Sequence, residues 1–343
     1  LMGYDPRQFH TGRSPLEAAS MGVALKGDEV AFRMNLVTLE HRAGGERVIT
    51  SHNAGDITTE EGRVLVDALR SELEGDGIAL HAGVGFRHLL VWKDGPEALA
   101  TTPPHDVLEQ DMASYLDRED LDPVVALIRR SWPILSDHPV NRERRKNGKL
   151  PATSIWLWGQ GRPPDMPSFE SLYGLRSGVI SAVDLINGIG IFAGFHPIPV
   201  QGATGLLDTN YEGKVCQALK GLATYDLIFL HVEAPDEAGH SGVTEAKMQA
   251  IEAFDARIVG PVLQGLADRS GDYRVLVVSD HFTPLSLRTH TPEPAPFAWA
   301  WAHELARSPG AARFTEAAAL ASGILFDPGY GIVRGFLEQG KQG

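Results

Sequence analysis

Five side chains able to bind metal ions stand in three short segments of the second half of the chain. They are the carboxylates of Asp236 and Asp280 and the imidazoles of His240, His281 and His290. Carboxylate oxygen and imidazole nitrogen are ligands for Mn²⁺, Zn²⁺ and other divalent ions. Five such ligands are too many for one tetrahedral site with an open position, and they suit two adjacent ions. Two adjacent metals stabilise both the attacking and the leaving oxygen of a phosphoryl transfer.

Two of these segments directly follow a predicted buried strand. The apolar run Leu227–Leu230 stops before Pro235, which cannot extend a central strand, and the first Asp and His follow it. The run Val275–Val278 is followed by Ser279 and then by the second Asp and His. Because open α/β sheets bind ligands beyond the carboxyl ends of their strands, these positions predict a metal site there. An i,i+4 pair on a surface turn is the alternative for the Asp-x-x-x-His spacing alone.

From residue 155 onward the sequence alternates between strand and helix patterns, which is typical of a parallel sheet with helices on its faces. The glycines of Gly188–Gly194 superficially match a dinucleotide fingerprint. The third glycine comes one position late and the segment is helix-like, so we reject NAD binding. The predicted strands are 155–158, 178–183, 195–200, 227–232 and 275–278, and the main predicted helices are 210–222 and 245–267.

The preceding part of the chain has a different pattern, with strands predicted at 30–37, 48–50 and 87–92 and helices at 15–21, 58–74 and 121–135. That order predicts a compact α+β domain inserted into the alternating part. The predicted fold class is therefore α/β, a mostly parallel sheet with helices on both faces plus an inserted α+β domain. The predicted divisions are residues 1–22, 23–150 and 151–343.

The metal-binding segments resemble those of a known family. Asp236–His240, Ser279–His281 and Thr289–Thr291 are similar to the metal motifs of the alkaline phosphatase superfamily, and most of all to its cofactor-independent phosphoglycerate mutases of the archaeal type. The resemblance extends over nearly the whole chain, from Leu1–Pro6 to Asp327–Tyr330. It implies an alkaline-phosphatase-like fold whose inserted domain binds the substrate.

The resemblance also implies how the five ligands are divided. Asp236, His240 and His290 would hold one divalent ion, and Asp280 and His281 would hold the second, with Mn²⁺ preferred over Zn²⁺ or Mg²⁺. The implied reaction interconverts 3-phosphoglycerate and 2-phosphoglycerate through a phosphoserine. The inserted domain would close over that intermediate and exclude water.

Two other functions stay open at this point. Thr11–Gly22 and Ile155–Gly161 also look like a bacterial branch of these proteins that has been proposed to act as homoserine kinase. The chain contains no Gly-x-x-x-x-Gly-Lys-[Ser/Thr] loop, although a metal-centred phosphotransferase need not use one. The remaining alternative is a folded but inactive metal-binding protein.

The chain begins at Leu1, inside a motif that resembles the family. Family members carry an Asp-Gly metal ligand and the nucleophilic Ser shortly before that motif, and neither has a counterpart here. We therefore expect an amino-terminally truncated fragment, with the nucleophilic Ser upstream of Leu1. Such a chain is expected to lack mutase turnover, and Asp280 and His281 are expected to bind their ion weakly.

Arginines are the candidates to bind the anionic substrate, because a guanidinium matches carboxylate and phosphate geometry. Two groups qualify: arginines in the first ninety residues, two of them within predicted strands, and the basic stretch Asn141–Lys149. For the basic stretch the alternative is a solvated helix end, where cations are favoured by the helix dipole. His105 and His138 are interpreted as structural. The substrate-binding candidates are Arg13, Arg33, Arg87, Arg142, Arg144 and Arg145.

Composition excludes several classes of partner. A net charge of −13 argues against non-specific nucleic-acid binding and gives no reason to expect a membrane partner, while local cations can still bind a small phosphorylated substrate. The single Cys216 rules out an intramolecular disulfide. No apolar run reaches the length of a membrane span, and Arg7 and Arg13 interrupt any signal-peptide core. We expect a cytoplasmic protein, with homo-oligomerisation left open.

Overall fold

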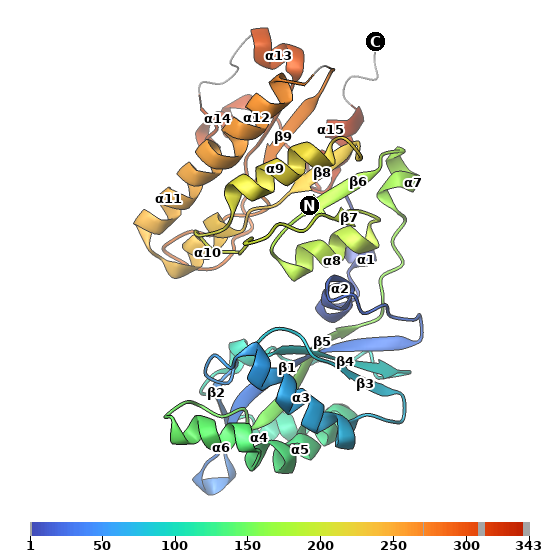
Figure 1. The fold of residues 1–343 in the computed structure, drawn as a ribbon, viewed down its shortest axis with the longest axis vertical. Coiled ribbons are helices and arrows are strands. Elements are labelled where there is room, and N and C mark those ends of the chain that lie inside the picture. The colour runs from blue at the N-terminus through green and yellow to red at the C-terminus, as the bar shows by residue number, and fades with distance from the viewer. Residues whose placement is uncertain (1, 270, 308–312, 339–343) are drawn as a thin grey trace. The chain divides into compact units, whose positions relative to one another are not determined.

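The computed structural model describes residues 2–269, 271–307 and 313–338. Contacts within the chain divide it into two units, the core unit (Leu1–Phe9 with Met166–Gly343) and the insert unit (His10–Asp165). The mixed α/β architecture with an α+β insert is the predicted fold class (Figure 1). The predicted divisions lay after residues 22 and 150. In the structure, residues 10–22 include helix α2 (Arg13–Ser20), which packs on the sheet of the insert unit, and residues 151–165 include strand β5 (Ser154–Gly161) of that sheet.

The insert unit is built on an antiparallel sheet around the long strand β1 (Glu29–His41). Strand β4 pairs with the first half of β1, and β5 pairs with it from Ala31 to Val37. The sheet order is β2-β1-β4-β3, with β5 paired to β1 off that path. The other strands are β2 (Arg47–Ser51), β3 (Ile78–His81), β4 (Arg87–Lys93) and β5 (Ser154–Gly161).

Both faces of this sheet are covered, which explains why β1 is buried along almost its whole length. Side chains alternate across a strand, so Phe32 and Met34 join the main core with α3 and α5, while Ala31 packs with Ala18 of α2 on the other face. Arg33 therefore projects to the α2 face. The helices of this unit are α2 (Arg13–Ser20), α3 (Thr59–Leu73), α4 (Ala113–Leu116), α5 (Asp122–Ser136) and α6 (Pro139–Lys146), with short 3₁₀ turns at Ala43–Gly45, Pro104–Val107 and Glu119–Leu121.

Two features of the insert unit bear on the predictions. The predicted helix at 58–74 is confirmed as α3, whose N-cap Thr58 forms a reciprocal capping box with Glu61. The prediction that residues 155–158 belong to the parallel part was wrong, because β5 runs antiparallel to β1. A strand pattern in the sequence identifies a buried strand and does not identify its partner.

The core unit contains a parallel sheet in which β6 (Ser177–Ile180) lies between β7 (His196–Pro197) and β8 (Leu227–Leu230). The parallel pairing predicted for these strands is confirmed. It was wrong for residues 275–278, because β9 (Arg274–Val278) pairs antiparallel with β10 (Phe297–Trp301).

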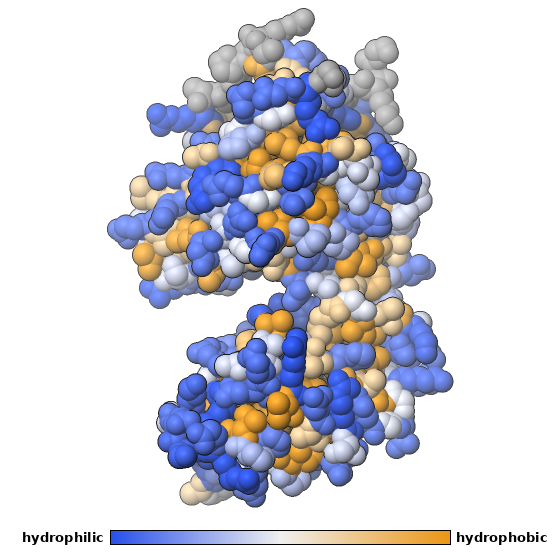
Figure 2. Space-filling view, in the orientation of Figure 1, coloured by the Kyte–Doolittle hydropathy of each residue, from blue (hydrophilic) through white to orange (hydrophobic). Residues whose placement is uncertain are grey.

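The helices of the core unit lie around these strands (Figure 1). The predicted helix at 245–267 is confirmed as α11 and α12, joined by a π-helical turn at Asp255–Val259. No helix in the described residues is both long and apolar enough to cross a membrane. Figure 2 shows polar side chains over most of the viewed face, with apolar side chains in separate patches. The remaining helices are α1 (Pro6–Phe9), α7 (Phe169–Tyr173), α8 (Asp184–Phe192), α9 (Tyr211–Gly221), α10 (Ala234–Ser241), α11 (Thr244–Phe254), α12 (Gly260–Ala267), α13 (Ala302–Arg307), α14 (Glu316–Ser322) and α15 (Gly331–Glu338).

Candidate functional site

The short helix α10 presents two of the predicted metal ligands. It begins at Ala234, a short connection after β8 ends at Leu230. Residues four apart lie on one face of a helix, so the side chains of Asp236 and His240 meet. Oδ2 of Asp236 lies 3.1 Å from Nε2 of His240. Gly242 ends the helix with φ of 72°, and a Cβ at that position would lie 2.2 Å from Nε of Arg288. The positive φ favours glycine there, and any larger residue would also have to displace the guanidinium of Arg288.

The loop between β9 and β10 brings the third predicted ligand to the same place. Nε2 of His290 lies 3.1 Å from Nε2 of His240 and 3.4 Å from Oδ1 of Asp236. One ligand atom from each of these three residues can be chosen so that all lie within 4.8 Å of one another. Among the residues that the structure describes, this is the only group of three or more His, Cys, Asp or Glu side chains with that geometry.

The hydrogen bond on the far side of His240 shows that this cluster fits a cation. Nδ1 of His240 donates to the carbonyl oxygen of Arg288 over 3.0 Å, which leaves Nε2 of the neutral ring as an acceptor. That acceptor faces the Asp236 carboxylate, itself an acceptor, so a positive charge between them is favourable. Metal-binding histidines commonly donate their second N–H to a carbonyl in this way. Arg288 supplies this carbonyl with φ of 54°, a conformation that non-glycine residues adopt rarely.

The other two predicted ligands adjoin this group. The ring of His281 stacks on that of His290 with centroids 3.8 Å apart, and its Nδ1 lies 4.0 Å from Oδ1 of Asp236. Oδ2 of Asp280 lies 3.4 Å from Nε2 of His281. Sequence reasoning missed Thr283, whose buried hydroxyl donates to Oδ1 of Asp236. A single Thr in a loop carries no pattern that could have identified it.

A second polar cluster lies in the insert unit, on the α2 face of the sheet. Arg33 of β1 and Arg13 of α2 both donate to the same oxygen of Glu17, the Arg13 bond measuring 2.7 Å. Both guanidinium groups also lie near the ring of Trp158, at 5.2 Å for Arg33 and 5.7 Å for Arg13. Arg33 and Glu17 are buried, whereas 44% of the Arg13 side chain is exposed. Two guanidinium groups thus share one carboxylate.

The groups around this pair are mainly cationic, although the carboxylate of Asp106 lies 3.7 Å from His105. Arg87 of β4 acts electrostatically on Arg33, and His105 packs edge-on against Trp158. Burial lowers the pKa of Arg33 to about 10, so its guanidinium stays charged at neutral pH. Burial also lowers the pKa of His105. The cluster therefore carries excess positive charge, the property expected of an anion-binding site.

The three candidate arginines of α6 contact other parts of the insert unit. Arg144 is buried, and its guanidinium donates to Glu61 and to the carbonyl oxygens of Ala54, Gly55 and Leu150. Arg142 and Arg145 are exposed, and each donates to a backbone carbonyl at or just beyond the end of α5. The contacts of Arg144 join separate segments of the insert unit. In the cluster around Arg33, by contrast, two guanidinium groups contact one carboxylate. His138 caps α6 by accepting from Val140, the structural role predicted for it.

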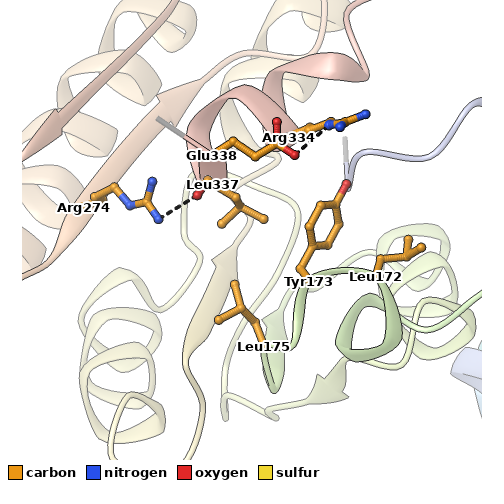
Figure 3. A pocket seen from close by; sticks show the side chains of 7 residues that line it. All are labelled: Leu172, Tyr173, Leu175, Arg274, Arg334, Leu337 and Glu338. Carbon is orange, nitrogen blue, oxygen red and sulfur yellow. Dashed lines mark hydrogen bonds and ion pairs between the residues drawn. The ribbon is translucent and has the colours of Figure 1, made fainter. Parts of the chain in front are cut away.

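The core unit also has a surface pocket, which no residue of either cluster lines (Figure 3). It is bordered by α7, β9 and α15, and none of the five predicted metal ligands lines it. Its two arginines are engaged: Arg274 donates to the carbonyl oxygens of Phe336 and Leu337, and Arg334 pairs with Glu338 at 2.8 Å. The contacts of Arg274 connect α15 to β9, whereas the pair of Arg334 and Glu338 lies within α15.

Comparisons with known proteins match both halves of the chain to described families. Residues 1–141 match the family model of 2,3-bisphosphoglycerate-independent phosphoglycerate mutase, and residues 135–322 match that of the metalloenzyme superfamily. A probable 2,3-bisphosphoglycerate-independent phosphoglycerate mutase of Geobacter sulfurreducens is 46% identical over 340 residues, which cover 99% of this chain and 84% of that protein. The 2,3-bisphosphoglycerate-independent phosphoglycerate mutase of Methanosarcina mazei is 49% identical over 300 residues, covering 87% and 74%.

A solved structure shows the same fold. A Pyrococcus horikoshii protein aligns with a TM-score of 0.74 and 26% sequence identity, covering 93% of this chain and 76% of that one. The alignment thus spans nearly all of both the core unit and the insert unit.

Proposed function

Since the chain belongs to the family of 2,3-bisphosphoglycerate-independent phosphoglycerate mutases, we propose that it serves the interconversion of 3-phosphoglycerate and 2-phosphoglycerate with Asp236, His240 and His290 as metal ligands. The observation that carries the proposal is the convergence of one carboxylate and two imidazoles at the carboxyl ends of strands. The family relationship makes the substrate a small phosphorylated molecule.

We propose two divalent ions for the complete site. The first is held by Asp236, His240 and His290, and the second by Asp280 and His281, which adjoin that group. Mn²⁺ is our preferred ion because the resemblance to the family implies it. The carboxylates suit Mn²⁺ and the imidazoles suit Zn²⁺, whereas Mg²⁺ prefers a shell of oxygen ligands. Bound ions of this kind neutralise phosphoryl oxygens and lower the pKa of an attacking hydroxyl.

The chain's own residues prepare the first site. The carbonyl of Arg288 holds the proton of His240 on Nδ1, so that Nε2 presents its lone pair to the ion. Thr283 donates to one oxygen of Asp236 and leaves the other facing His240. Both contacts hold the ligands in position before any ion binds, which lowers the free-energy cost of assembling the site.

We further propose that Arg13 and Arg33 bind an anionic group of the phosphoglycerate. Glu17 holds the two guanidinium groups together, and the half-exposed Arg13 retains N–H groups for a carboxylate or phosphate. Arg87 supplies further positive charge. Arg142, Arg144 and Arg145 have contacts that support a structural role instead. A cytoplasmic location remains a prediction, supported by the free and exposed thiol of Cys216.

The test is an enolase-coupled assay of 3-phosphoglycerate conversion by the protein as its gene encodes it. We expect turnover that a chelator abolishes and Mn²⁺ restores, and that His240→Ala removes. The control is His303→Ala, which changes an exposed histidine of α13 in the same unit.

The competing activity is measured in parallel with homoserine and ATP. Metal-dependent phosphorylation of homoserine, without conversion of 3-phosphoglycerate, would replace the proposed substrate while keeping the metal site. Conversion that persists at full rate in both the chelator and His240→Ala would refute the metal site.

A further inference from the structure

The five residues between β8 and Asp236 are held by contacts from three different elements. This connecting loop (His231–Pro235), whose last two residues already belong to α10, carries no proposed metal ligand, yet its path decides where Asp236 lies. Ser181 after β6, Lys214 of α9 and Lys247 of α11 each bind one of its end residues. Without these three contacts the backbone of the connecting loop could shift, and Asp236 would shift with it.

Lys214 makes the most costly of these contacts. Its side chain is fully buried, and its ammonium donates to the carbonyl oxygen of His231 over 2.9 Å. Burial lowers the pKa of Lys214 to about 8, with Glu233 acting in the opposite direction, so the ammonium remains largely charged at neutral pH. Burying an ammonium costs free energy, and its hydrogen bond to the carbonyl oxygen of His231 offsets that cost only in part. We infer that the contact itself has a function.

The side chain of His231 is fixed as firmly as its carbonyl. Nε2 lies 3.2 Å from the carboxylate of Glu233, and Nδ1 lies 3.1 Å from the hydroxyl of Ser181. Because a carboxylate accepts only, the neutral ring carries its proton on Nε2, and the Ser181 hydroxyl donates to Nδ1. The carbonyl of Glu233 in turn accepts from the backbone N–H of Asp236 over 2.8 Å. A chain of contacts thus runs from Ser181 to Asp236.

The far end of the loop is held from α11. The ammonium of Lys247 donates to the carbonyl oxygen of Pro235 over 2.7 Å, immediately before Asp236. The loop is therefore held at both ends, and a shift of the backbone before Asp236 would break hydrogen bonds that are partly shielded from water.

We propose that Lys214 is a positioning residue of the metal centre, which sets the place of Asp236 through the connecting loop. The inference rests on the proposed metal site. Groups that orient metal ligands without touching the ion typically change metal affinity by about 10–100-fold when they are removed. Lys214 acts one step further away, through the backbone, so the expected loss of affinity is about tenfold.

The test separates two roles of the Lys214 ammonium, because they predict opposite changes in the affinity for the metal ion. Removing a positive charge near a cation site tightens cation binding when that charge does nothing else. Removing a positioning group weakens binding, because Asp236 leaves its place. Lys214→Met keeps the length and apolar stem of the side chain and removes only the charged donor.

The experiment measures the Mn²⁺ dissociation constant of the chain by titration calorimetry, and free Mn²⁺ by electron paramagnetic resonance. The variants are Lys214→Met and, as a matched control on the same helix, Lys220→Met, whose side chain is exposed. We expect the dissociation constant to rise about tenfold in Lys214→Met and to change less than twofold in Lys220→Met. An unchanged or tighter constant in Lys214→Met would overturn the inference.

A milder variant covers the case in which Lys214→Met does not fold. Ser181→Ala removes one hydroxyl from the other anchor, and we expect the Mn²⁺ constant to rise several-fold with an unchanged circular dichroism spectrum. An unchanged constant in Ser181→Ala would then refute the positioning role of the loop. If the unmodified chain binds no Mn²⁺ at all, the proposed metal site fails instead, so the two failures are distinguishable.

Discussion

The Nε2 atoms of His240 and His290 lie 3.1 Å apart, although fifty residues separate them in the chain. The carbonyl of Arg288 accepts the Nδ1 proton of His240, so the Nε2 atom of the neutral ring is an acceptor. Asp236 adds carboxylate oxygens at 3.1 Å from one ring and 3.4 Å from the other. Nε2 of His240 and the Asp236 carboxylate are two acceptors that face each other, and a cation between them is favourable.

Replacing Arg33 by Lys should weaken phosphoglycerate binding much more than it weakens the fold. Arg33 donates to both Glu17 and Asn35, and a Lys ammonium lacks the planar fork that serves two acceptors at once. We expect the dissociation constant for 3-phosphoglycerate to rise about tenfold or more, which corresponds to about 1.4 kcal/mol. Calorimetry measures it, with the urea midpoint as the readout of stability.

The matched control for this prediction is Arg142→Lys, because Arg142 is exposed on α6 and donates to the carbonyl oxygen of Asp137, just beyond the end of α5. It should leave binding unchanged. Equal losses in the two variants would show that the cluster around Arg33 has no particular role in binding the anion.

Arg144→Ala should destabilise the insert unit, although Arg144 stands next to exposed arginines. The substitution leaves Glu61 without its buried partner and three carbonyl oxygens without a donor. Removing one partner of a fully buried ion pair typically costs about 3–5 kcal/mol, and we expect the lower end of this range because 27% of the Glu61 side chain is exposed. Arg145→Ala removes one exposed contact and should cost about 1 kcal/mol or less. Urea denaturation of both variants measures the difference, and similar losses would contradict the assignment.

These arginines show what sequence reasoning could and could not supply. The basic stretch at Asn141–Lys149 was visible as a charged helix, but the pattern does not reveal which of its members is buried. Arg144 is buried because the loop at Ala54 and Gly55 passes over it, and that contact spans ninety residues. Long-range contacts of this kind depend on the whole fold.

Local features were predictable because their causes are local. The capping box of Thr58 and Glu61 depends on residues three apart, and the i,i+4 placement of Asp236 and His240 follows from one helical turn. The partner of β5 was predicted wrongly, because strand pairing is decided by distant segments. Lys214 went unnoticed for the same reason, since only the fold brings it to the carbonyl of His231.

Because of His88, the free energy of unfolding of the insert unit should fall when the pH is lowered from neutral to mildly acidic values. Burial lowers the pKa of His88 from 6.5 to about 4, and its Nδ1 accepts from the backbone N–H of Gly83. Between pH 6.5 and 4 the unfolded chain binds this proton and the folded chain does not, so stability falls as the pH falls. The full loss from this group is about 3 kcal/mol.

Comparison with His88→Asn isolates this effect, because Asn keeps an acceptor and does not titrate. Unfolding free energies are measured in urea from pH 7 to pH 4. The unmodified chain should lose more stability over this window than the variant. Parallel curves for the two proteins would show that His88 is protonated equally in the folded and unfolded states.

The most direct test of the metal centre is the number of Mn²⁺ ions bound by the purified chain with and without His240→Ala. Calorimetric titration of metal-free protein gives the stoichiometry, and His303→Ala serves as the histidine control. We predict that His240→Ala loses the tight site while its circular dichroism spectrum is unchanged, and that His303→Ala keeps it. Unchanged stoichiometry and affinity in His240→Ala would contradict the proposed site of Asp236, His240 and His290.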